Sequence, residues 1–217
     1  MRTLIETPSA GPRPAILIAL LPGTFSEPED FVREGFPAAL RAQGIEADVV
    51  MGEVRAAWFA DGSIVRRIEE AVVGPARARG HSRIWLAGIS LGGLAALGYC
   101  ARHEGEIEGV VLISPYPATR EVLREIEAAG GIGQWDPVIA AGGDLEREAW
   151  QWLARRREEH PAVHCYIASA DRFAPGQRLM ARALDPGKVR ERPGGHDWES
   201  WRAMWAEFLV DAKAVLQ

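Results

Sequence analysis

The sequence RIWLAGISLGGLAALGYC, residues 83–100, places a serine between two glycines at the junction of two differently patterned segments. Residues 83–89 form a short, almost continuously apolar run that is typical of a buried strand, whereas the residues after Ser90 follow a helical pattern. A serine on a strand-to-helix turn is held in a strained conformation that exposes its hydroxyl, and Gly88 and Gly92 lack side chains that would collide across the turn. We therefore interpret Ser90 as a candidate nucleophile.

The same alternation of strand-like and helix-like segments continues on both sides of this stretch. Strands separated by helices favour right-handed crossovers and a parallel sheet that is covered on both faces. The expected fold class is α/β, a three-layer sandwich with a mostly parallel sheet of about six strands. The expected strands are 15–21, 45–51, 83–89, 109–114, 163–169 and 188–193, and the expected helices are 26–44, 63–79, 91–103, 176–184 and a last one from about residue 199.

One segment, residues 118–160, interrupts this alternation with helical pieces and glycine clusters but no strand-like run. We expect it to form a short helical lid inserted into a single domain that spans residues 1–217. The glycines at 130–133 follow no expected strand and lack the spacing of a dinucleotide-binding loop, so no such cofactor is expected.

Composition and charge exclude several classes of partner. The formal net charge is −5 with an isoelectric point near 5.6, and the basic run 155–157 is followed at once by two glutamates, so no nucleic-acid partner is expected. Cys100 and Cys165 lie in apolar segments, where reduced cysteine behaves as a small hydrophobic side chain. The first apolar run is too short to span a bilayer and no signal peptide is evident, so we expect a cytoplasmic protein without a membrane partner.

A serine hydroxyl is a weak nucleophile unless a base removes its proton, and a third group must orient that base. Active sites of open α/β sheets lie beyond the carboxyl ends of the strands. His196 follows the last expected strand in a glycine-rich loop, which makes it the favoured base. The other four histidines are expected at the opposite end of the sheet or within packed segments; they are His81, His103, His160 and His164.

For the acid, Asp171 comes just after the expected strand 163–169, where a carboxylate can reach the distal nitrogen of His196. Asp197 and Glu199 are nearer to the histidine in sequence. We rank them lower, because a residue next to the histidine points away from its ring and both suit the start of the final helix.

Ser90, Asp171 and His196 each follow an expected strand, in that order along the chain. In this order the sequence resembles the α/β-hydrolase superfamily, and the resemblance extends from Ala15 to the final helix. Residues 88–92 match its nucleophile elbow, residues 170–173 look like its acid loop, and residues 194–196 look like its histidine loop. The resemblance implies a compact, esterase-like serine hydrolase. It also implies that the two leading strands of the usual eight are missing.

The resemblance further implies an oxyanion hole made by the backbone N–H groups of Leu91 and Thr24, with Gly23 or Phe25 as alternatives to Thr24. The substrate-binding walls are less defined by the pattern. Our candidates are Trp58, Tyr116 and Trp198, followed by the weaker candidates Phe59, Trp135 and Phe173, whereas Trp201, Trp205 and Phe208 have the spacing of a core-facing helical stripe.

The expected activity is that of a serine hydrolase that cleaves a small or medium carboxylic ester or thioester through an acyl-enzyme on Ser90. Its partner would be a small-molecule acyl substrate, and no metal or organic cofactor is expected. Two alternatives stay open: a non-catalytic small-molecule binding protein with the same fold, and an acyltransferase that uses the same triad.

Overall fold

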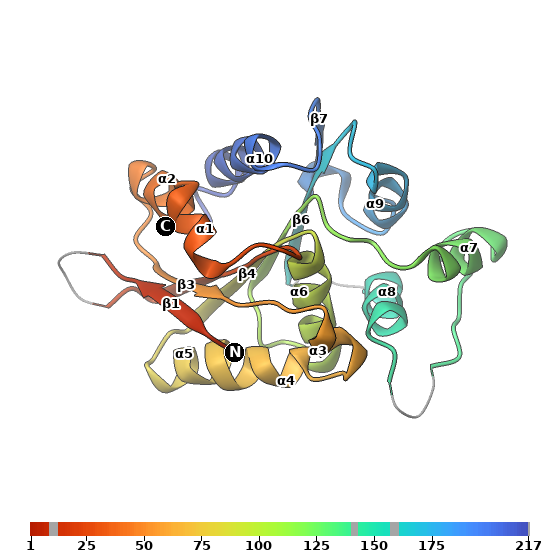
Figure 1. Ribbon diagram of the computed structural model, residues 1–217, viewed down its shortest axis with the longest axis horizontal. Coiled ribbons are helices and arrows are strands. Elements are labelled where there is room, and N and C mark those ends of the chain that lie inside the picture. Colours follow the sequence, from red (N-terminus) through yellow and green to blue (C-terminus); the bar gives the residue numbers. More distant parts are fainter. Residues whose placement is uncertain (9–12, 140–142, 157–160, 217) are drawn as a thin grey trace.

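The computed structural model describes residues 1–8, 13–139, 143–156 and 161–216, and its centre is a seven-stranded sheet (Figure 1). The strand order is β1-β3-β2-β4-β5-β6-β7, and all pairs are parallel except β1 with β3. The α/β fold class and the mostly parallel sheet are thereby confirmed. The strands are β1 Thr3–Glu6, β2 Ile16–Leu21, β3 Asp48–Gly52, β4 Arg83–Ile89, β5 Gly109–Ile113, β6 Ala162–Ala168 and β7 Val189–Arg192.

Strand β1 adds a seventh strand to the six expected and corrects the expected loss of both leading strands. It lies at the edge of the sheet, antiparallel to β3, with Thr3 opposite Gly52 and Glu6 opposite Val49. Its four residues, TLIE, show no clear alternation of apolar and polar side chains, and each of them is only partly buried or exposed. Prolines follow shortly after them in the chain, so the sequence gives no strand signal here. Pairing with β3 creates this strand, and that partner lies more than forty residues away in sequence.

Helices cover both faces of the sheet (Figure 1). The first face carries α4 Ile64–Ile68, a π-helical turn Glu69–Val73, α5 Gly74–Ala78, α6 Leu91–Arg102, α8 Leu145–Arg155 and α9 Ala174–Ala181. The other face carries α1 Pro28–Arg33, α2 Phe36–Ala42 and α10 Trp198–Asp211. Helix α7 Arg120–Ala128 also contributes Val122 and Ile126 to the core on the first face, and the remaining elements are α3 Ala57–Ala60 and a 3-10 turn Pro186–Lys188. In the described parts of the chain, no helix has both the length and the apolar character that a membrane crossing requires.

The single helix expected at 26–44 is instead two helices, α1 and α2. Gly35 separates them with a φ of 75°, in the left-handed region that glycine adopts most easily. Pro37, in the first turn of α2, has no backbone N–H and would clash in the interior of a longer helix. The proline therefore starts a new helix.

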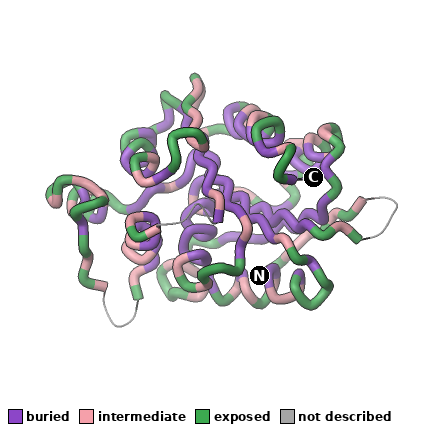
Figure 2. Tube along the Cα trace, turned by 180° about the vertical axis from the view of Figure 1, so that it is seen from behind, coloured by how far each residue is buried: buried purple, intermediate pink, exposed green. Residues whose placement is uncertain are grey.

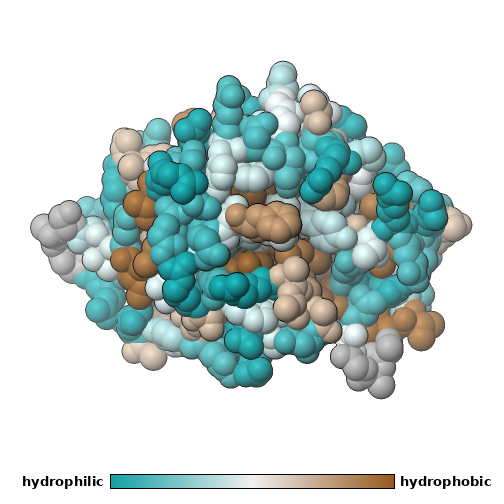
Figure 3. All heavy atoms as spheres, in the orientation of Figure 1, coloured by the Kyte–Doolittle hydropathy of each residue, from teal (hydrophilic) through white to brown (hydrophobic). Residues whose placement is uncertain are grey.

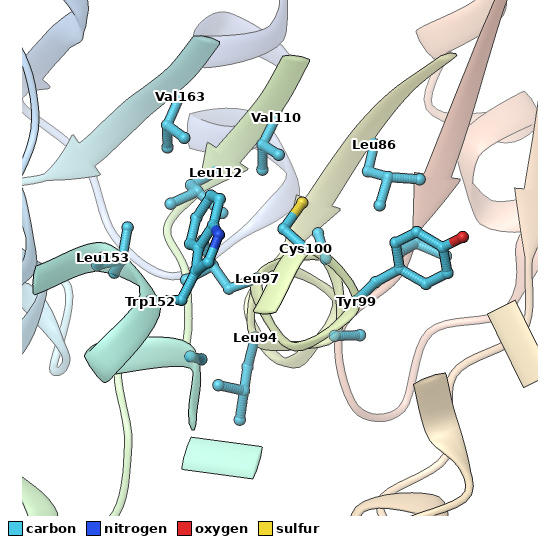
Figure 4. Packing of buried hydrophobic residues seen from close by; sticks show 14 of the residues in the cluster. Leu86, Leu94, Leu97, Tyr99, Cys100, Val110, Leu112, Trp152, Leu153 and Val163 are labelled. Atoms are coloured by element: carbon cyan, nitrogen blue, oxygen red, sulfur yellow. The ribbon is translucent and has the colours of Figure 1, made fainter. Parts of the chain in front are cut away.

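Buried strands form a band across the molecule, and the helices around it expose their outer faces (Figure 2). Each face of the sheet has its own hydrophobic core. Figure 4 shows part of the first core, where Cys100 of α6 lies among strand residues such as Leu86 and Val110. Cys100 and Cys165 are both unpaired and buried, and burial raises the pKa of each thiol to about 12. They therefore pack as small hydrophobic side chains.

The described part of segment 118–160 contains two helices, α7 and α8, and no strand. Residues 140–142 and 157–160 lie outside the described residues. Helix α8 packs on α6 and contributes Trp152 and Leu153 to the first core (Figure 4). The indole N–H of Trp150 donates a hydrogen bond of 2.7 Å to the carbonyl oxygen of Pro117. Helix α8 thus belongs to the helical layer that covers the sheet.

His164 gives the fold an expected pH dependence. It lies buried in β6, with ring centroids 6.0 Å from Trp85 and 5.3 Å from Phe208. Burial, with a smaller contribution from Lys188, lowers the pKa of His164 to about 4. In the unfolded chain the imidazole has a pKa of about 6.5, so below that pH the unfolded state binds a proton that the folded state does not. Stability from this residue is therefore present above that pH and is lost as the pH falls toward 4.

We expect this histidine to lower the free energy of unfolding by about 1–2 kcal/mol at pH 5 relative to pH 7. Urea unfolding of the wild type and of His164→Phe at both pH values measures the effect. The variant should lose less stability on acidification than the wild type. Equal losses in both proteins would assign the acid sensitivity to other groups.

Candidate active site

Ser90 lies on the turn between β4 and α6 in a strained backbone conformation, with φ 51° and ψ −117°. Such a backbone region costs a non-glycine residue about 1–3 kcal/mol and persists only where the surroundings enforce it. Its N–H donates to the carbonyl oxygen of Ile113 at 3.1 Å, and its carbonyl oxygen accepts from Tyr116 N at 2.8 Å and Gly93 N at 3.0 Å. Strand β5, the loop after it and the first turn of α6 therefore hold the turn in place.

The two glycines around Ser90 are required by close backbone contacts. A Cβ on Gly88 would lie 2.3 Å from the backbone of Gly92, and a Cβ on Gly92 would lie 2.1 Å from the carbonyl oxygen of Leu21. Both distances are far shorter than any van der Waals contact. The turn can reach this geometry only with glycine at both positions.

The structure brings Ser90, His196 and Asp171 together from loops that follow β4, β7 and β6. His196 Nε2 lies 3.0 Å from Ser90 Oγ, and His196 Nδ1 lies 2.7 Å from Asp171 Oδ2. The imidazole is also held by ring contacts, with centroids 5.3 Å from Phe173 and 5.1 Å from Trp201. This arrangement fixes which imidazole nitrogen faces the serine.

The carboxylate of Asp171 is buried and accepts three hydrogen bonds. The N–H of Phe173 donates to Oδ1 at 2.8 Å, and the amide of Gln177 donates to Oδ2 at 3.0 Å, beside the contact with His196. Burial by itself raises the pKa of Asp171, but the hydrogen bonds from His196, from the Phe173 N–H and from Gln177 outweigh it and lower the pKa below its usual value. Asp171 is therefore ionised at neutral pH.

The other candidate acids and bases lie elsewhere. Asp197 is the N-cap of α10 and accepts a hydrogen bond of 2.9 Å from Ser200 N, while Glu199 occupies the first turn of that helix. His81 Nε2 lies 2.8 Å from Asp48 Oδ2 at the opposite end of the sheet. His103 stacks on Tyr99, with ring centroids 4.4 Å apart, and His164 lies inside β6. His160 is outside the described residues.

The loop after β2 runs directly beside Ser90. A Cβ on Gly23 would lie 3.7 Å from Ser90 Oγ, and Ser26 N donates to the Gly23 carbonyl oxygen at 3.2 Å to close a turn. Thr24 and Leu91 both line the cleft in front of the serine. Leu91 is the first residue of α6, so its N–H has no partner within the helix. The donor roles of Leu91 and Thr24 stay predictions.

A cleft of about 950 Å³ opens beside Ser90 and His196. Tyr116 lines it, whereas Trp58 and Trp198 do not, which corrects the wall positions expected for these two tryptophans. Trp58 lies under the guanidinium of Arg67, 4.5 Å from the ring centroid, and Trp198 packs against Phe31 and Phe36. Apolar lining residues are Phe25, Phe59, Leu91, Leu94, Tyr116, Leu145, Phe173 and Trp201.

Several of these lining residues were not expected from the sequence. Trp201 has the spacing of a core-facing residue, yet its ring also borders the cleft and His196. Leu94 and Leu145 come from α6 and α8, whose apolar positions look identical in sequence whether they face the core or the cleft. Figure 3 shows apolar side chains gathered near the middle of one face of the molecule among hydrophilic ones.

Charged side chains at the cleft are largely engaged with one another. Arg102 pairs with Glu148 at 2.6 Å, and Arg147 pairs with Asp144 and Glu125. Among the described residues, the side chains grouped closely enough to hold a metal ion are Glu69, His103 and Glu106, and none of them lines the cleft. The cleft is therefore of mixed polarity, with aromatic and aliphatic side chains beside charged and polar ones such as Arg102, Glu121, Asp144 and Arg147.

The sheet order, the strained serine and the histidine and aspartate that follow later strands define an α/β-hydrolase. The sequence model named Esterase, described as "Putative esterase", matches residues 67–212. The chain belongs to this family and is a hydrolase. A search of curated proteins by sequence finds no match.

Several solved structures with the same fold bear the names of esterases or hydrolases, each at low sequence identity to this chain. FphF, a fluorophosphonate-binding serine hydrolase of Staphylococcus aureus, has a TM-score of 0.67 at 14% identity, covering 96% of this chain and 90% of that one. The esterase domain of a Rhodothermus marinus protein has a TM-score of 0.65 at 17% identity, covering 97% and 91%. The S-formylglutathione hydrolase FrmB of S. aureus has a TM-score of 0.64 at 13% identity, covering 93% and 82%.

Proposed function

We propose that this hydrolase cleaves a small or medium carboxylic ester or thioester through an acyl-enzyme on Ser90. The observation that carries the proposal is the hydrogen-bonded chain from Asp171 through His196 to Ser90, with distances of 2.7 and 3.0 Å. A nucleophile, a base within hydrogen-bond reach and a buried carboxylate that orients the base are the parts that acyl transfer to serine needs.

In the proposed reaction, Ser90 Oγ attacks the carbonyl carbon while His196 Nε2 takes the hydroxyl proton. The carbonyl oxygen becomes negatively charged and is held by the backbone N–H groups of Leu91 and Thr24. When the tetrahedral species collapses, the bond to the alcohol or thiol breaks and His196 returns its proton to that leaving group. A water molecule, activated by the same histidine, then releases the acid and restores Ser90.

The cleft supports the proposed size and polarity of the substrate. A volume of about 950 Å³, lined by aromatic and aliphatic side chains together with charged ones, accommodates an acyl group of small or medium size. We further propose that residues 1–217 act as one domain and that segment 118–160 covers the cleft as a helical lid, with α7 and α8 both held by buried side chains in the first core. Glu121 of α7 lines the cleft, which supports this assignment.

A fluorophosphonate probe, followed by intact-mass analysis and peptide mapping, tests the activated serine. We expect one adduct on Ser90 in the wild type and labelling slower by at least about 10²-fold in His196→Ala, because the unassisted hydroxyl is a poor nucleophile. His103→Ala is the matched control, since this histidine lies away from Ser90 and should label like the wild type. A folded wild type without an adduct would favour a non-catalytic binding protein instead.

A further inference from the structure

Phe25 combines a strained backbone conformation with a side chain that packs against nothing in the fold. It is the third residue of the turn that begins at Gly23, and its φ of 70° lies in the left-handed region that favours glycine or asparagine. For a bulky residue this backbone costs about 1–2 kcal/mol. Its side chain is also fully exposed, with a relative accessibility of 102%. Strain in the backbone and exposure of a phenyl ring thus occur in the same residue.

The strained and exposed Phe25 lies close to the candidate nucleophile Ser90. The residue lines the cleft, and its turn begins at Gly23, where an added Cβ would lie 3.1 Å from Ser90 Cβ. The same cleft is lined by the aromatic side chains of Phe59, Tyr116 and Phe173. Backbone strain in a non-glycine residue is most often found at functional sites, where the strained geometry serves binding or catalysis.

We propose that Phe25 is a specificity-determining residue that covers the apolar part of the substrate at the mouth of the cleft. This inference rests on the proposed function and deepens it: the preferred substrates are esters or thioesters whose acyl group is apolar and longer than acetyl. An acyl chain placed against the phenyl ring removes both surfaces from water. Each methylene group buried in this way is worth roughly a fourfold gain in kcat/KM.

The test is the ratio of kcat/KM for p-nitrophenyl hexanoate to that for p-nitrophenyl acetate, measured below the concentration at which the esters aggregate. We expect Phe25→Gly to lower this ratio by about 10-fold, which corresponds to losing the burial of one to two methylene groups. Glycine suits the backbone of this turn and keeps the N–H group, so it removes the ring alone. Phe25→Tyr should restore most of the ratio, because it restores the ring.

Val210→Ala is the matched control, because Val210 is an exposed apolar residue of α10 outside the cleft lining, with 62% of its surface accessible. It should keep the wild-type ratio. An unchanged ratio in Phe25→Gly, or an equal fall in Val210→Ala, would overturn the assignment of Phe25. If the wild type hydrolysed none of these esters and formed no adduct on Ser90, the proposed function itself would be overturned.

Discussion

Replacing Ser90 with glycine is expected to lower kcat for ester hydrolysis by about 10⁶-fold while stabilising the fold by about 1–2 kcal/mol. The activity is lost because no other side chain stands 3.0 Å from His196 Nε2 in the described site. The stability rises because glycine adopts the φ of 51° and ψ of −117° at this turn without the strain that Ser90 carries. Initial-rate assays and urea unfolding of the purified variant measure the two effects.

Ser90→Ala separates the two effects. Alanine removes the hydroxyl, so turnover should fall as far as in the glycine variant. It keeps a Cβ in the same strained backbone, so stability should stay close to that of the wild type. If either variant kept more than about a hundredth of the wild-type turnover, the nucleophile would have to be a different residue.

Asp171→Asn is expected to lower kcat by about 10⁴-fold with little change in the overall fold. The carboxylate accepts from His196 Nδ1 at 2.7 Å, which keeps Nε2 unprotonated and directed at Ser90. An asparagine whose amide oxygen keeps the hydrogen bond from the Phe173 N–H places its NH₂ group at the Oδ2 position, where it donates to His196 Nδ1, so the tautomer that can accept the serine proton is no longer favoured. Steady-state kinetics with a short-chain ester, together with circular dichroism, measures both outcomes.

Asp197→Asn is the matched control for this change. Asp197 is adjacent to His196 in sequence and carries the same charge, but it caps α10 through Ser200 N. Asparagine is about as good an N-cap as aspartate, so stability should be nearly unchanged and turnover should stay within about threefold. A loss in Asp197→Asn as large as that in Asp171→Asn would show that the orienting carboxylate is misassigned.

The sequence could predict much of the candidate site because each polar residue follows a strand. Parallel strands end at the same edge of a sheet, so Ser90, Asp171 and His196 are expected together once the strands are recognised. The cleft walls could not be predicted in this way. Trp58 and Trp198 looked like wall residues because of their position near strand ends, but packing against Arg67, Phe31 and Phe36 takes both rings out of the lining.

Edge strand β1 is a part of the fold that could not be predicted from the sequence. Buried central strands such as β2 and β4 carry long apolar runs, because both of their faces are covered by helices. Strand β1 has four residues and one neighbour, so its backbone hydrogen bonds to β3 define it more than its side chains do. An edge strand of this kind has no strong signal in the sequence before its partner is known.

The sequence by itself determined the α/β class, the strand-to-helix turn at Ser90 and the order of the three candidate catalytic residues, because apolar periodicity and glycine positions are local properties of the chain. The tertiary structure decided the position of β1, the anchoring of α8 on α6 and the aromatic lining that includes Trp201 and Phe25. These features depend on contacts between segments distant in sequence. Whether an apolar side chain faces the core, the cleft or solvent is set by the segment that lies opposite.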